Sequence, residues 1–172
     1  APPLAGSRVT LRRLGASDLS AFQAYRGDPD VGKFQGWLPM TDAEAGVFLD
    51  HMATAVPFAP GAWFQFGIAD RDSNVLIGDI GVCVAADGGH AEIGFTLRAS
   101  AQGRGLGSEA VRAVVDLLLD RVKVPRVVAI TDAPTHSGPS GTPDLLPYYP
   151  YPASYGAPSF TQTVSAVRAA GV

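Results

Sequence analysis

An alternating pattern of apolar and polar residues opens the chain. Within residues 8–14, basic and polar side chains separate Val9, Leu11 and Leu14, which predicts a half-buried strand. In residues 16–26 the apolar positions recur every three or four residues instead, which is the period of an amphipathic helix. The chain is therefore expected to begin with a strand that is followed directly by a helix.

Three residues are spaced as helix caps usually are. Ser17 precedes the apolar positions of the first predicted helix and is a candidate cap. Thr41 and Glu44 have the spacing of a capping box, in which a hydroxyl and a carboxylate each satisfy one backbone N–H of the first turn. Residues 41–52 therefore predict a second helix.

Three apolar segments separated by short polar turns come next. They cover residues 62–71, 75–86 and 90–98, and the turns at 72–74 and 87–89 consist of Asp, Ser, Asn and Gly. Such turn residues between strand-like segments indicate hairpins. We predict an antiparallel meander of three strands.

The following segment has the period of a helix with one apolar face. In residues 106–123 the apolar stripe, which could pack on the sheet, consists of Val111, Val114, Val115, Leu118 and Val122. After Pro125, residues 126–132 form a short β-branched run that is typical of a central strand. The predicted order up to Asp132 is β-α-α-β-β-β-α-β, which belongs to the α/β (α+β) class.

Composition restricts the class of protein. A chain of 172 residues with 47% apolar and 17% charged residues is long enough for one domain with a substantial core. The net charge of −3 provides no basic stripe for a nucleic acid. No segment approaches the roughly 18 consecutive apolar residues of a membrane span. We therefore predict a single domain over residues 1–172 of a cytoplasmic protein, with neither nucleic acid nor membrane as a partner.

Glycines crowd residues 101–110 (AQGRGLGSEA) at the start of the long predicted helix. A P-loop would need a lysine here, and a dinucleotide-binding fingerprint would need its third glycine where Ser108 stands. Gly103, Gly105 and Gly107 instead fit either a nest of backbone N–H groups that binds an anion or a flexible turn. The pattern of glycines alone leaves both interpretations open.

Several short motifs, taken in order, resemble the GNAT superfamily of N-acetyltransferases. The glycine segment matches the acyl-CoA loop of that superfamily as Gln102-x-x-Gly105-x-Gly107, after a strand that ends EIGFTL. The segments LRRL, AYRGDPDVGKFQGW, LIGDIGV, GLGSEAVRAVVDLL and RVVAITD are similar to the branch that includes ribosomal-protein-alanine acetyltransferases. The resemblance covers about residues 7–133. It implies the GNAT acyltransferase fold, a central mixed, mainly antiparallel sheet flanked by helices.

The resemblance also implies how acetyl-CoA binds, with no metal involved. The backbone N–H groups of the loop would hold the pyrophosphate, and a Cβ at position 105 or 107 would obstruct its approach. The strand before the loop would pair its backbone, more than its side chains, with the amide groups of the pantetheine arm. The residues assigned to these roles are Phe95, Thr96 and Leu97 on the strand and Gln102, Gly103, Arg104, Gly105, Leu106, Gly107 and Ser108 in the loop.

Enzymes of this family transfer the acetyl group directly from thioester to amine, so no covalent nucleophile is required. The single cysteine, Cys83, is accordingly expected to be a small core residue. An attacking ammonium must first lose a proton, and Glu92 is the candidate base. Alternation along the strand places Glu92 on the face opposite Phe95 and Leu97. The alternative interpretation is a structural role as a hydrogen-bond acceptor.

The acceptor side offers fewer signals. Phe34 and Trp37 could form the wall of an acceptor site, although aromatic residues at this density are also typical of core packing. Asp28, Asp30 and Asp79 could attract a cationic amine, or they could cap helices and form turns.

The chain departs from the family pattern after residue 133. Seven of its 14 prolines lie between Pro134 and Pro158, which rules out a continuous helix and discourages inner strands. A change of reading frame would explain this composition, and translation of the coding DNA in the other two frames would test it. We expect residues 134–172 to cover the sheet as irregular coil, or a partner chain to cover it, for example in a homodimer.

These observations predict an acetyl-CoA-dependent N-acetyltransferase that acts on a primary amine, either a protein N-terminus or a small molecule. The divergent C-terminal segment is expected to impair its activity. The alternative is an acyl-CoA-binding or interaction protein on the same fold that does not catalyse transfer. A third interpretation, a nicotinamide-linked enzyme, would bind dinucleotides and not coenzyme A.

Overall fold

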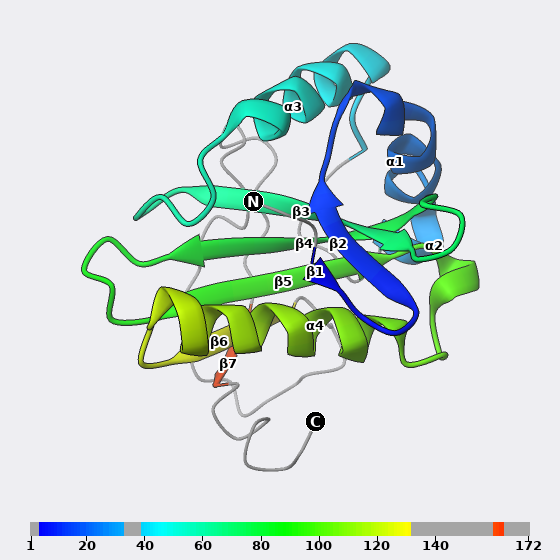
Figure 1. Ribbon diagram of the computed structural model, residues 1–172. Coiled ribbons are helices and arrows are strands. Elements are labelled where there is room, and N and C mark those ends of the chain that lie inside the picture. Colours follow the sequence, from blue (N-terminus) through cyan, green and yellow to red (C-terminus); the bar gives the residue numbers. More distant parts are fainter. Residues whose placement is uncertain (1–3, 33–38, 132–159, 164–172) are drawn as a thin grey trace.

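The computed structural model describes residues 4–32, 39–131 and 160–163 of the chain. Within these ranges, strands β1 to β7 form one sheet in chain order, with helices packed on it (Figure 1). The elements are β1 (Leu4–Ala5), β2 (Val9–Arg13), η1 (Ala16–Asp18), α1 (Leu19–Arg26), α2 (Pro29–Gly32), α3 (Asp42–Thr54), β3 (Trp63–Asp70), β4 (Leu76–Val84), β5 (Ala91–Leu97), η2 (Ala99–Ala101), α4 (Leu106–Asp116), the π-helical η3 (Leu117–Val122), β6 (Val127–Thr131) and β7 (Phe160–Thr163).

The sheet is mixed and mainly antiparallel, as predicted. Strands β3, β4 and β5 form the expected antiparallel meander, and β5 pairs in parallel with β6. Parallel neighbours need a crossover connection, and here α4 and η3 supply it. The predicted order of elements up to residue 131 is confirmed, with the additional short elements β1, η1, α2 and η2.

Helices α1 and α4 cover opposite faces of the sheet. Asp79 of β4 lies opposite Thr96 of β5 in register, and Asp79 contacts α1. A Cβ on Gly107 of α4 would meet the side chains of Phe95 and Leu97, which alternate with Thr96 along β5. Figure 1 shows α4 running along one side of the sheet, away from α1 and α3, which lie close to each other.

The helix that begins at Asp42 has the predicted cap. The Thr41 N–H donates to Glu44 Oε2 at 2.8 Å, and the Glu44 N–H donates to Thr41 Oγ1 at 3.3 Å. This reciprocal pair is the capping box that the spacing predicts.

The cap predicted at Ser17 is wrong. Ser17 is exposed, whereas the next residue, Asp18, is buried. The Asp18 carboxylate accepts from the Gly15 N–H at 3.0 Å and from the Arg12 guanidinium at 2.8 and 2.9 Å. Arg12 of β2 therefore holds the Asp18 carboxylate in place as its ion-pair partner. The spacing of residues along the sequence does not reveal this partner.

The apolar stripe of the long helix faces the core as predicted. Val114, Val115 and Leu118 are buried, and Val111 and Val122 pack against the core while partly exposed. The helix changes from α to π geometry at η3 and ends at Lys123, which adopts a left-handed backbone with φ of +67°.

One strand comes from the proline-rich C-terminal segment. Residues 160–163 form β7, which pairs antiparallel with β6 from Val128↔Thr163 to Thr131↔Phe160. The expectation of irregular coil is therefore wrong for these four residues, which follow the last proline, Pro158. No proline interrupts these four residues, so each of them has the backbone N–H that strand pairing needs. The rest of that prediction, for residues 134–159 and 164–172, lies outside the described residues.

Candidate functional site

The glycine-rich loop has a backbone that requires two of its glycines. Gly103 and Gly105 have φ of +71° and +76°, in the left-handed region. A side chain in this conformation costs roughly 1–2 kcal/mol, whereas glycine adopts it readily. Gly105 is also the N-cap residue of α4, so the chain turns sharply into the helix at this point.

The loop presents a row of backbone N–H groups. From Gly103 to Ser108, no N–H donates to an acceptor within the described part of the chain, and no side chain caps α4. The first N–H groups of a helix carry a partial positive charge from the helix dipole. Together with the preceding loop they form a nest that fits an anion such as a phosphate.

Gln102 closes this loop onto the preceding strand. Its side-chain Nε2 donates to the Leu97 carbonyl at 2.9 Å, which ties the start of the loop to the end of β5. The resemblance implies a role for the Gln102 backbone N–H, and the structure adds this tether through the side chain.

Gly107 also packs against the preceding strand. A Cβ on Gly107 would lie 2.8 Å from Cε2 of Phe95 and 3.2 Å from Cδ1 of Leu97. These contacts lie on the sheet side of α4, so the lack of a side chain at Gly107 allows close packing of helix on strand, and its role beside a phosphate stays a prediction. The side chains of Phe95 and Leu97 therefore pack against α4, in addition to the binding role predicted for their backbones. By contrast, Thr96 is buried on the other face of β5.

Among the described residues, the edge of β5 beside β6 is unpaired, and in this sense open, over its second half. The two strands pair only from Ala91↔Val127 to Ile93↔Ala129, although β5 continues to Leu97. The Ala91 N–H donates to the Arg126 carbonyl of the segment before β6 at 2.9 Å. The two-residue period of a strand then directs the backbone N–H and C=O of Phe95 toward the same side, beyond the last strand pair. This edge leads directly to the glycine-rich loop.

Glu92 lies on the sheet face opposite α4, as the alternation predicts. Its register partners are Cys83 on β4 and Val128 on β6. Its carboxylate lies 3.4 Å from Nε2 of His90, and its side chain is 12% exposed. Five residues of strand separate it from Leu97, about 17 Å at the usual rise per residue. Glu92 is thus placed beside the open edge and away from the loop.

Cys83 lies on the same face and is half-buried rather than enclosed in the core. Burial, and then the negative charge of Glu92, raise the pKa of the Cys83 thiol to about 11. The thiol is therefore protonated at neutral pH, and a protonated thiol is a poor nucleophile.

A buried polar cluster surrounds Asp79. The carboxylate is 2.8 Å from Nη2 of Arg26, and it accepts from the Tyr25 hydroxyl at 2.5 Å and from Gln65 Nε2 at 2.8 Å. Asp79 has no exposed surface, so the interpretation of Asp79 as an attractor of a cationic amine is wrong. Its charge is already compensated by Arg26 on α1. No spacing in the sequence signals this contact between helix and strand.

The other residues considered for the acceptor have mixed outcomes. Asp28 accepts from the Asp30 N–H at 2.9 Å through its side chain, which is the capping alternative. Phe34 and Trp37 lie outside the described residues.

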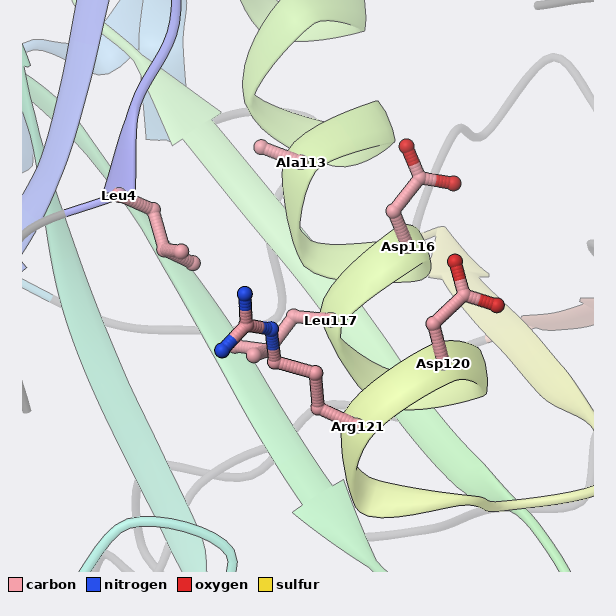
Figure 2. A pocket seen from close by; sticks show the side chains of 6 residues that line it. All are labelled: Leu4, Ala113, Asp116, Leu117, Asp120 and Arg121. Carbon is pink, nitrogen blue, oxygen red and sulfur yellow. The ribbon is translucent and has the colours of Figure 1, made fainter.

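A surface hollow of about 220 Å³ lies at the far end of α4 from the loop. Figure 2 shows its lining side chains, which come from β1, α4 and η3: Leu4, Ala113, Asp116, Leu117, Asp120 and Arg121. It shares no residue with the loop or with the open edge of β5. In the ranges that the structure describes, there is no cluster of candidate metal ligands and no helix able to span a membrane.

Comparisons with known proteins agree on one family. The model of the acetyltransferase (GNAT) domain matches residues 8–136. An uncharacterized N-acetyltransferase p20 of Bacillus licheniformis is 27% identical over 139 residues, which cover 80% of this chain and 74% of that protein.

Solved structures show the same fold. A GNAT-family acetyltransferase from Bacillus anthracis superimposes with a TM-score of 0.64 at 22% identity, covering 75% of this chain and 73% of that one. RimL, a ribosomal L7/L12 alpha-N-protein acetyltransferase solved in complex with coenzyme A, gives 0.62 at 17% identity, covering 76% and 75%.

Proposed function

Because the chain belongs to the GNAT acetyltransferase family, we propose that it transfers an acetyl group from acetyl-CoA to a primary amine. The observation that supports this most strongly is the row of N–H groups from Gly103 to Ser108, which donate to no acceptor in the described ranges. A nest of this kind binds phosphate oxygens. It stands at the end of the open edge of β5, where an extended ligand can pair with backbone groups.

The residues present fit acetyl-CoA. The left-handed glycines Gly103 and Gly105 turn the loop amides outward to hold the pyrophosphate. The backbone of Phe95 would pair with the amides of the pantetheine arm. When bound, acetyl-CoA supplies the activated thioester whose acetyl group is transferred.

Glu92 is the residue we assign as general base. An ammonium has no lone pair with which to attack, so a base must first accept its proton, and a carboxylate can do so. Glu92 is mostly shielded from solvent, and its neighbour His90 is more exposed. The deprotonated amine nitrogen then attacks the carbonyl carbon of the thioester: the C–N bond forms, the C–S bond breaks, and coenzyme A leaves as a thiolate that takes up a proton, with no acetylated side chain as an intermediate. The raised pKa of the Cys83 thiol is consistent with this direct route.

The acceptor class is either a protein N-terminus or a small-molecule amine. RimL, by its name, acts on the α-amino group of a ribosomal protein, and this supports testing peptide N-termini first. The cytoplasmic location and the homodimer remain predictions from the sequence.

A second candidate function is binding of acyl-CoA without transfer. It is favoured by residues 134–172, whose proline-rich composition departs from the family pattern that covers residues 8–136. No residue of this segment can be matched to the group that protonates the departing thiolate in related enzymes.

Thiol release separates the two functions. The chain would be incubated with acetyl-CoA and a panel of peptides with free N-termini, polyamines and aminoglycosides, and free coenzyme A would be measured. Amine-dependent thiol release supports transfer. Saturable binding of acetyl-CoA with no release above the hydrolysis background would support the second function. Affinity for NAD and none for coenzyme A would contradict both.

A further inference from the structure

The carboxylate of Glu109, in the first turn of α4, connects the helix to the start of the chain. Its Oε1 accepts from the Arg8 N–H at 2.7 Å, from the Ser7 hydroxyl at 3.2 Å and from the Val9 N–H at 3.4 Å. Ser7 and Arg8 belong to the turn between β1 and β2, and Val9 is the first residue of β2. Glu109 therefore docks this turn against the N-terminus of α4.

The side chain of Arg8 extends this connection into the glycine-rich loop. Its Nε is 3.1 Å from Glu109 Oε2, and its Nη1 donates to the Arg104 carbonyl at 2.8 Å. A Cβ on Gly105 would lie 3.3 Å from its Nη2. One planar guanidinium thus joins the carboxylate on α4 to the carbonyl just before Gly105, and this fixed fork is specific to arginine.

The turn is shaped to allow this contact. A Cβ on Gly6 would collide with Glu109 Oε1, so only glycine fits there without displacing the carboxylate. The turn is closed by a hydrogen bond from the Gly6 N–H to the Val9 carbonyl at 2.8 Å. Arg71 also donates to the carbonyls of Gly6 and Ser7, both at 3.2 Å, without touching the loop.

Charge explains why the carboxylate needs its partner. A carboxylate near a helix N-terminus is favourable for the free helix, but it repels an anionic ligand bound at the same end. The guanidinium of Arg8 neutralises Glu109 and turns it into a structural support. Side chains that hold a binding loop in one geometry reduce the entropy lost when the ligand binds.

We propose that Arg8 and Glu109 are positioning residues that hold residues 103–105 of the loop in the conformation that binds the pyrophosphate of acetyl-CoA. This inference rests on the proposed function. Neither residue needs to touch the transferred group, so they should govern affinity for acetyl-CoA and leave the chemical step unchanged.

The test compares Arg8→Ala with Arg71→Ala. Both substitutions remove an arginine that holds the same turn, but only Arg8 contacts the loop. For Arg8→Ala we expect the Kd for acetyl-CoA to rise about fivefold to tenfold, a change that corresponds to roughly one lost hydrogen bond. The kcat at saturating acetyl-CoA and the KM for the amine should stay within about twofold. For Arg71→Ala the Kd should stay within about twofold even if the Tm falls equally.

Two further variants sharpen the result. Arg8→Lys keeps the charge but not the fork, so it should bind acetyl-CoA as weakly as Arg8→Ala; full recovery would contradict the positioning role. Glu109→Gln keeps an oxygen that can accept from the Arg8 N–H and removes the ionic partner of the guanidinium. Glu109→Gln should therefore also raise the Kd for acetyl-CoA. If Arg8→Ala does not fold, Glu109→Gln is the variant that tests the inference.

The inference fails if Arg8→Ala binds acetyl-CoA as the parent does, or if Arg71→Ala loses as much affinity. Failure of the proposed function is a separate result, namely that the parent itself does not bind acetyl-CoA. In that case the positioning role is tested without ligand, by backbone ¹⁵N relaxation of Gly103 and Gly105. If Arg8 holds the loop, the order parameters of these two glycines fall in Arg8→Ala and not in Arg71→Ala.

Discussion

A side chain is unfavourable at two glycines of the loop, for a different reason at each. Gly103 has a left-handed backbone but open space around its Cα, whereas Gly107 is helical and packed against Phe95 and Leu97. A methyl group at position 103 therefore meets only backbone strain, and one at 107 meets other atoms.

We predict that Gly107→Ala lowers the free energy of unfolding by about 1–3 kcal/mol through overpacking. Gly103→Ala should cost about 1–2 kcal/mol through its backbone conformation alone and should also disturb the loop. Urea unfolding and the Kd for acetyl-CoA would be measured for both. Comparable loss of affinity and no loss of stability in Gly107→Ala would contradict the packing role.

Glu92 should control turnover and not binding. We predict that Glu92→Gln lowers kcat by roughly 10²-fold or more, because general-base catalysis typically supplies 10² to 10⁴. The Kd for acetyl-CoA should be nearly unchanged, since Glu92 lies five residues from the end of β5 at Leu97. Activity within a few fold of the parent would assign the proton transfer to water or to another group.

Glu109 should contribute to the pH dependence of stability. Its burial alone would raise its pKa, but the hydrogen bonds from Arg8 and its neighbours outweigh this and lower the pKa from 4.5 to about 2. A group whose pKa is lower in the folded state stabilises the fold above its unfolded pKa. This stabilisation should therefore be complete above about pH 5 and disappear as the pH falls from there toward 2.

The measurement is the Tm of the parent and of Glu109→Gln across this range. The parent should have the higher Tm at pH 6, and the difference should shrink toward zero near pH 2. A difference that is the same at both pH values would show that Glu109 acts through packing instead of charge.

For the helices and strands, the periodicity of apolar residues was enough to predict most of the fold. The alternation in β2, the turns of the meander and the stripe of α4 are local patterns, and each predicted element formed within a few residues of its expected bounds. The stripe was predicted correctly because the spacing that gives a helix one apolar face lies within the sequence of that helix.

The features that the sequence could not reveal are contacts between segments that lie far apart in the chain. Arg8 and Glu109 are 101 residues apart, and Arg26 and Asp79 are 53 apart. The burial of Asp18, in place of a cap at Ser17, depends on its ion pair with Arg12 of β2, which the spacing of residues 16–26 does not show. The packing of Gly107 likewise depends on where β5 lies, so the glycine pattern predicts a binding loop but does not reveal this contact with the sheet.

The packing of α4 and η3 supports a stability prediction. Leu118 begins the π-helical part of the stripe and is fully buried, whereas Val47 on α3 is 72% exposed. Leu118→Ala should lower the free energy of unfolding by about 2–5 kcal/mol, and Val47→Ala should change it by less than about 0.5 kcal/mol. Similar values for the two variants in urea unfolding would contradict the packing described for this helix.

At the scale of the whole molecule, the sheet brings the parts of the site together along one strand. The strand β5 carries Glu92 near its start and ends beside the glycine-rich loop, and its pairing with β6 stops between them. The acetyl group and the pyrophosphate of one extended ligand could therefore bind at the two ends of a single open edge.

The N–H groups at the start of α4 are proposed to bind the pyrophosphate of acetyl-CoA. A titration of the ¹⁵N-labelled chain with acetyl-CoA, followed by the chemical shifts of the backbone amides, tests this binding. We expect saturable shift changes with a Kd between about 1 μM and 1 mM, largest from Gly103 to Ser108, and no changes with NAD at the same concentrations. Unchanged shifts in this loop, or equal changes with NAD, would contradict it.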